Sequence, residues 1–221
     1  MAHLIPVELL TRIEAHERWL QTTKREGQSL AQGNMDLRDL DLSGRQLAMA
    51  TLPDACFDRT VLRGANLSDS NLRGASFIEA ILDGGWLVET DADHANFSGA
   101  SLREVRGVSL EVLEADFRMA DLTGGNFSNA DFSEANLEYT NFSLVDLREA
   151  YFYKANMKHA TLTGALLQGA ELAGATGLEL AKVEWIDIGE ENAPQRLEGE
   201  QARHWLLTEA AKLVPKGATS T

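Results

Sequence analysis

The residues that could do chemistry in this chain are five histidines, one cysteine and many carboxylates. The histidines are scattered without a metal-ligand spacing such as HExxH, at His3, His16, His94, His159 and His204. Cys56 has no partner cysteine. The sequence also lacks a GxSxG motif, a phosphate-binding glycine loop and a dinucleotide-binding glycine pattern. We therefore predict a protein that is not an enzyme and that holds no metal and no cofactor.

The carboxylates follow a spacing of five residues. Aspartate or asparagine recurs at multiples of this interval, at Asp36, Asp41, Asn66, Asn71, Asn96, Asp116, Asp121, Asn126, Asp131, Asn136, Asn141, Asp146 and Asn156. Many aspartates thus stand where a repeat requires them, and we do not expect any two acidic residues to form a catalytic pair.

The same interval governs the apolar residues. All eight phenylalanines lie at the position that follows this polar one, at Phe57, Phe77, Phe97, Phe117, Phe127, Phe132, Phe142 and Phe152. Leucines share that position and small residues stand two places before it, so each unit reads small, Asp or Asn, Leu or Phe, polar, polar. A period of five fits neither a helix nor a strand, so the chain must turn once in every unit. We expect the large residue to fill an interior and the small one to fit a corner, where recurring glycines allow the turn.

This pattern resembles the pentapeptide-repeat family, most clearly at "ANLSDSNLRGASF" (65–77) and "ADLTGGNFSNADFSEANLEYTNF" (120–142). The resemblance implies an all-β solenoid, a right-handed four-sided β-helix over residues 35–176. Four units in each coil would stack residues twenty apart, so that Phe57, Phe77, Phe97 and Phe117 form an internal ladder. About seven coils, rising about 4.8 Å each, would give a rod about 34 Å long.

One stretch breaks the pattern. Within 103–114, Val105 and Leu110 occupy slots for small residues, and Gly107 occupies a slot for a large one. We expect this segment to leave the coil as an outward loop with a short helical turn that begins at Ser109. If ten residues leave the coil, the phenylalanine ladder breaks before Phe117.

The two ends are predicted to be capping segments, because open coil ends expose backbone groups and apolar interior. Residues 1–34 should hold a helix from Pro6 to about Lys24, with Leu9, Ile13 and Leu20 on one side. Residues 177–221 should hold an irregular segment and an amphipathic helix from about Glu198 to Val214.

Composition points to the setting and to the kind of partner. A lone cysteine and the lack of a signal-like or membrane-spanning apolar run favour the cytoplasm, with no membrane contact. The net charge is −14, and the repeats carry about 22 acidic against about 11 basic residues. Such a field repels nucleic acid and attracts basic protein surfaces, so direct DNA or RNA binding is not expected. We expect the acidic residues to be spread over the repeats rather than concentrated on one face.

Two functions fit. Quinolone-resistance and self-immunity members of the family bind type II topoisomerases by imitating duplex DNA, so the resemblance implies a partner such as DNA gyrase or topoisomerase IV. The candidate contacts are Asp121, Asp131 and Asp146 on the coil and Arg106, Val108 and Leu110 in the expected loop. The alternative is a structural adaptor or scaffold with an unrelated protein partner.

Two apolar features could mediate assembly. Tyr139, Tyr151 and Tyr153 lie at outward positions near basic residues, and could form a binding hot spot or be covered by residues 185–214. The resemblance also suggests a homodimer through the C-terminal helix, for which Trp205, Leu206 and Leu213 are candidates.

Overall fold

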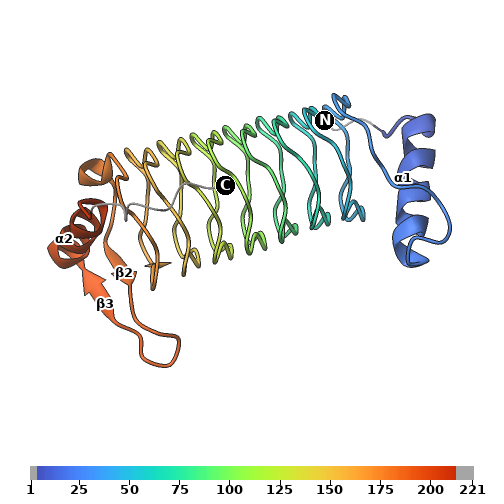
Figure 1. Cartoon of the computed structure of the whole chain (residues 1–221). Helices are drawn as coiled ribbons and strands as arrows, with labels where there is room; N and C mark the ends of the chain where they lie inside the picture. Colours follow the sequence, from blue (N-terminus) through green and yellow to red (C-terminus); the bar gives the residue numbers. More distant parts are fainter. Residues whose placement is uncertain (1–3, 213–221) are drawn as a thin grey trace.

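The computed structural model describes residues 4–212 and is a row of stacked coils with a helix at each end (Figure 1). Helix α1 spans Val7–Gln21 and lies at the first coil. The last coils lead into β1 (Ala165–Leu166), the 3-10 helix η1 (Leu178–Leu180), β2 (Trp185–Asp187), β3 (Arg196–Glu198) and helix α2 (Gly199–Ala210). Strand β2 pairs parallel with β1 and antiparallel with β3, so a three-stranded sheet ends the stack.

Parallel backbone bridges define the coils. They join residues twenty apart, from Ala31 with Thr51 to Asn156 with Thr176, and a last bridge joins Thr161 with Lys182. Four pentapeptides therefore complete one coil, and the chain is a β-helix. The first bridge lies four residues before the predicted start at residue 35.

Each pentapeptide ends in a tight turn. The N–H of the small residue donates to the carbonyl of the large residue three places earlier, as Ala50 does to Leu47 at 3.1 Å. From Asn34 to Gly174 every residue at the fifth position of its unit has a positive φ, between 52° and 79°. Glycine adopts this backbone without strain, which explains why the repeated glycines share this position.

The aspartate or asparagine of each unit stabilises the same turn. Its side-chain oxygen accepts the N–H two residues later, as in Asp41 with Ser43 and Asn66 with Ser68, both at 3.0 Å. This Asx bond is the structural reason for the periodic carboxylates.

The interior is filled by the large residues, and all eight phenylalanines are fully buried. The predicted ladder is confirmed, because the rings of Phe57, Phe77, Phe97 and Phe117 stack with centroids 4.6 to 4.7 Å apart. Aromatic contacts at this spacing add to the stability that burial alone provides.

The predicted loop at 103–114 is wrong. This segment stays in the coil, because Arg106 bridges Asn126 and Glu111 bridges Asp131. Val105 and Leu110 are fully buried in their small-residue slots, and Ser109 lies at a turn with φ 54° instead of capping a helix. The space that Gly107 leaves is occupied by the ring of Phe127 in the next coil, whose Cδ1 would lie 2.6 Å from a Cβ built at Gly107.

Both terminal helices pack on the solenoid through a few residues. In α1, Ile13 and His16 are buried and Leu9 is partly buried against the core. In α2, Ala202 and Leu206 are fully buried. The helices are shorter than predicted, since α1 ends at Gln21 and α2 at Ala210.

Candidate functional site

The outward side chains of the second position form four columns along the solenoid, one on each face. One column runs through Asn71, Asp91, Glu111, Asp131, Tyr151 and Glu171, which are joined by successive bridges. We call this face, with the turn residues at its two edges, the acidic face. It carries eleven acidic residues, which are Asp54, Asp69, Glu89, Asp91, Asp93, Glu111, Glu114, Asp131, Glu134, Glu149 and Glu171.

Three lysines or arginines lie on this face, namely Arg73, Arg148 and Lys154. The rest of residues 35–176 has eleven acidic and eight basic residues, so the acidic face holds about eight of the net eleven negative charges of the repeats. The sequence suggested spread charges, and the structure corrects this. Comparison of every twentieth residue in the sequence reveals this concentration of acidic residues, because residues twenty apart lie on the same face.

On the other faces, carboxylates form ion pairs with arginines. Asp36 lies 2.7 Å from Arg38, Asp116 lies 2.6 Å from Arg118, and the guanidinium of Arg38 helps lower the pKa of Asp36 to about 2. Because these ion pairs neutralise many of the carboxylates, the other faces have little net charge.

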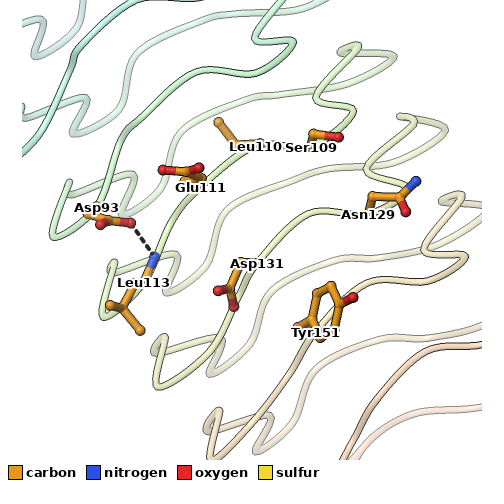
Figure 2. Close-up of a pocket in the computed structure, with 8 residues that line it drawn as sticks. All are labelled: Asp93, Ser109, Leu110, Glu111, Leu113, Asn129, Asp131 and Tyr151. Atoms are coloured by element: carbon orange, nitrogen blue, oxygen red, sulfur yellow. Dashed lines mark hydrogen bonds between the residues drawn. The ribbon is translucent and has the colours of Figure 1, made fainter. Parts of the chain in front are cut away.

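The middle of the acidic face is an open groove of about 480 Å³ (Figure 2). Glu111, Asp131 and Tyr151 succeed one another along it, and Asp93 accepts the N–H of Leu113 at 3.0 Å. Arg73 binds Asp93 at 2.6 Å at one end. Partial burial, then the charges of Asp91, Asp93 and Asp131, raise the pKa of Glu111. The groove therefore has a strongly negative potential that a cationic side chain would relieve.

The three aspartates proposed as contacts have unequal surroundings. Asp131 lies in the groove, and its carboxylate accepts the N–H of Ser133 at 2.9 Å. Asp121 and Asp146 lie on other faces and pair with Arg103 and Arg148, each at 2.6 Å. Burial by itself would raise the pKa of Asp121, but hydrogen bonds from Thr123 and Arg103 lower it overall. Only Asp131 belongs to the acidic face.

The residues of the expected loop do not form one site. Leu110 is fully buried beneath the groove, whereas Arg106 lies on the neighbouring face and Val108 lies at the turn between the two faces. The Arg106 guanidinium lies over the ring of Trp86, 5.1 Å from its centroid, and Trp86 is 44% exposed. Leu110 cannot contact a partner in this fold.

The tyrosine cluster is largely open. Tyr139 is 52% exposed and stacks on His159, twenty residues later, with centroids 4.7 Å apart. Tyr151 is 43% exposed, and Tyr153 is half-buried with the Lys154 ammonium 4.6 Å from its ring centroid. Residues 185–212 therefore do not cover Tyr139 or Tyr151.

The dimerisation candidates lie mainly against their own chain. Leu206 is fully buried and Trp205 is half-buried against the core, while Leu213 lies outside the described residues. Within residues 4–212 no group of three or more His, Cys, Asp or Glu side chains could hold a metal ion. No helix in that range is long and apolar enough to cross a membrane.

Comparison with protein families matches residues 55–91, 114–148 and 146–176 to pentapeptide repeats, in eight copies. The chain is a pentapeptide-repeat protein. A search of curated proteins found no match.

Two structures of trypsin-treated QnrB1 variants, described as a plasmid-mediated fluoroquinolone resistance protein, resemble this pentapeptide-repeat protein. Their TM-scores are 0.64 and 0.60 at 20% and 21% identity, covering 71% and 70% of this chain and 80% and 78% of theirs. A pentapeptide repeat protein of the Arabidopsis thaliana thylakoid lumen is 33% identical over 51% of this chain and 71% of its own, with a TM-score of 0.31. The QnrB1 likeness establishes the β-helix fold.

Proposed function

We propose that this chain is a non-enzymatic, protein-binding rod that imitates DNA and occupies the DNA-binding surface of a type II topoisomerase, DNA gyrase or topoisomerase IV. The observation that carries the proposal is the acidic face, where negative charge is concentrated and largely unpaired. The description of QnrB1 as a resistance protein supports a protective role of the same kind, against a quinolone or as self-immunity. The proposal also includes a cytoplasmic location and a right-handed helix of about seven coils capped by α1 and α2.

The charge density of the acidic face fits this role. Its acidic residues run from Asp54 to Glu171, about six coils, or about 28 Å at about 4.8 Å per coil. A net of about eight charges over that length gives roughly one charge per 3.5 Å, close to the 3.4 Å per charge along one strand of B-DNA. The face thus resembles one strand of a duplex, and a basic groove that binds DNA should attract it.

Binding to gyrase tests the proposal, with inhibition of supercoiling and relief of poison-induced cleavage as readouts. The triple variant Glu89→Lys, Glu111→Lys and Glu114→Lys reverses charge on the acidic face and should weaken binding at least roughly tenfold. The control triple Glu79→Lys, Glu104→Lys and Glu138→Lys makes the same change in net charge on other faces.

The control should weaken binding less than about threefold, and wild-type affinity should fall as salt rises. Equal losses in the two triples would show that net charge, and not the acidic face, governs binding. A wild-type protein without effect on supercoiling or cleavage at micromolar concentration would overturn the proposal.

A second candidate function is that of an adaptor. It is favoured by a row of outward side chains formed by Met119, Tyr139 and His159. Met119, 70% exposed, lies one coil before Tyr139, whose ring stacks on His159. Exposed aromatic residues can serve as hot spots for a protein partner. Tyr139→Ala should then abolish partner binding while the acidic-face triple retains it, the reverse of the topoisomerase result.

A homodimer that pairs through Trp205 and Leu206, as the sequence suggested, is part of neither proposal. Pairing through α2 would have to use its outer side near Leu207, which is 39% exposed, because Leu206 is buried in its own chain. Truncation of α2 would therefore uncover the solenoid end as well as remove a contact.

A further inference from the structure

The first coil lacks a preceding coil, so its backbone needs other hydrogen-bond partners. Inside the stack, the N–H of Asn66 donates to the carbonyl of Arg45, and the carbonyl of Ser68 accepts the N–H of Met49. The equivalent groups of the first coil, twenty residues earlier, are the N–H of Gln46 and the carbonyl of Ala48. Without partners they would form an open edge.

Two neighbouring residues of α1 supply both missing partners. Glu17 Oε1 accepts the N–H of Gln46 at 3.1 Å, and His16 Nε2 lies 2.9 Å from the carbonyl oxygen of Ala48. A second carboxylate oxygen of Glu17 accepts from Arg45 at 3.2 Å. The pair of side chains thus takes the place of a strand of the absent coil.

The His16 ring can do this in one protonation state only. It is fully buried, and its Nδ1 accepts the N–H of Leu30 at 2.9 Å. A backbone N–H can only donate and a carbonyl can only accept, so Nδ1 carries no proton and Nε2 carries one. A second proton on Nδ1 would face the Leu30 N–H, and would break that bond inside a buried interface.

The groups packed around His16 have opposing effects on its pKa. Burial lowers the pKa of His16. The carbonyl of Ala48 in the first coil and the charge of Glu17 on α1 raise this pKa by less, so the net shift is downward. The Glu17 charge is itself paired with Arg45 of the first coil. The Trp19 ring stacks on the imidazole at 5.6 Å, with Lys24 over that ring, and Arg12 bonds Gln32.

We propose that His16 is an acid-sensitive latch that holds α1 on the first coil. Protonation of its Nδ1 expels the ring from the interface, releases α1 and uncovers the N–H of Gln46 and the carbonyl of Ala48. The rod would then have one closed and one open end under mild acid.

Amide hydrogen exchange of Leu30 and Gln46 measures the latch directly. A base buried in its neutral form stabilises the docked state above its free pKa of 6.5 and loses that effect as pH falls toward the docked value. The opening constant, corrected for intrinsic exchange, should therefore rise about tenfold per pH unit below about 6.5. Amides in the middle of the solenoid, such as that of Asn96, should show no such slope.

Variants separate titration from structure. His16→Gln keeps one donor and one acceptor without titrating near neutral pH, so its Leu30 exchange should be independent of pH between 6.5 and 5. His204→Gln, on the exposed side of α2, should keep the wild-type slope. A flat wild-type profile, or an unchanged slope in His16→Gln, would overturn the proposal.

If His16→Gln fails to dock α1, the ring can be titrated in the wild-type protein by NMR. A His16 pKa at or above 6.5 would then equally refute the latch.

Discussion

The contact between Gly107 and Phe127 predicts a sharp interaction between two substitutions. Gly107 stands in a slot for a large residue, and a Cβ there would lie 2.6 Å from Cδ1 and 2.7 Å from Cε1 of Phe127. Gly125 is equally close, with its hypothetical Cβ 2.6 Å from Cε2 of the same ring. The ring of Phe127 therefore uses interior space that two glycines vacate.

Each single change should destabilise the solenoid for an opposite reason. Gly107→Leu inserts a side chain where the Phe127 ring lies, and such overpacking costs about 1 to 3 kcal/mol. Phe127→Leu leaves a void beside both glycines, at a cost of about 1 to 2 kcal/mol. The double variant has leucine in both slots, as at Leu87 and Leu147 of the same column, and should cost less than about 1 kcal/mol.

Urea unfolding followed by circular dichroism measures this double-mutant cycle. The expected coupling is about 1 to 3 kcal/mol in favour of the double variant. Gly107→Leu combined with Phe57→Leu, which is distant along the stack, should instead be additive. Additive free energies for Gly107→Leu with Phe127→Leu would refute the argument that these residues share space.

Three further predictions concern the ladder, the groove and the coil. Phe97→Ala should lower the free energy of unfolding by about 3 to 5 kcal/mol, because the ring is fully buried between two stacked neighbours; a loss below about 1 kcal/mol would contradict the packing. Glu111→Gln should raise the melting temperature slightly at pH 7 but not below pH 4.5, since a raised carboxyl pKa destabilises the fold only where the group is charged; an equal effect at both pH values would exclude the charge as its cause. Deleting residues 103–112 should sharply lower the melting temperature, whereas deleting the whole coil 101–120 should preserve a β-rich spectrum, because only the second keeps residues twenty apart in register; equal stability of the two would contradict the bridges.

The sequence predicted the fold well because one period repeats throughout the solenoid. The interior position of Phe97 and the glycine turns follow from a five-residue period alone. The loop predicted at 103–114 was wrong because the prediction considered each repeat position separately. Gly107 is acceptable only because Phe127 comes twenty residues later, and such compensation between coils is invisible within one pentapeptide.

The sequence predicted a helix at each end of the solenoid, but not the residues through which each helix contacts it. The amphipathic pattern indicated α1 and α2, yet nothing in the sequence marked His16 as a buried ligand of two backbone groups. Its role depends on the end of the first coil, where unpaired groups arise from the three-dimensional stack. Leu206 likewise belongs to an apolar stripe that fits a dimer or a cap, and only its burial decides between them.

The position of the carboxylates within the unit separates their effects on folding and on binding. On the acidic face, Asp91 and Asp131 accept turn N–H groups from Asp93 and Ser133, so their replacement would weaken the coil as well as the charge. Charge reversal at Asp121, Asp131 and Asp146 would for that reason confuse loss of binding with loss of fold. Glu111 projects from the same column and Glu114 from the adjacent turn, and the groove gains their charge without a turn bond from either. Glutamates should therefore carry the adjustable part of partner recognition, and affinity should follow their number on this face while stability follows the aspartates.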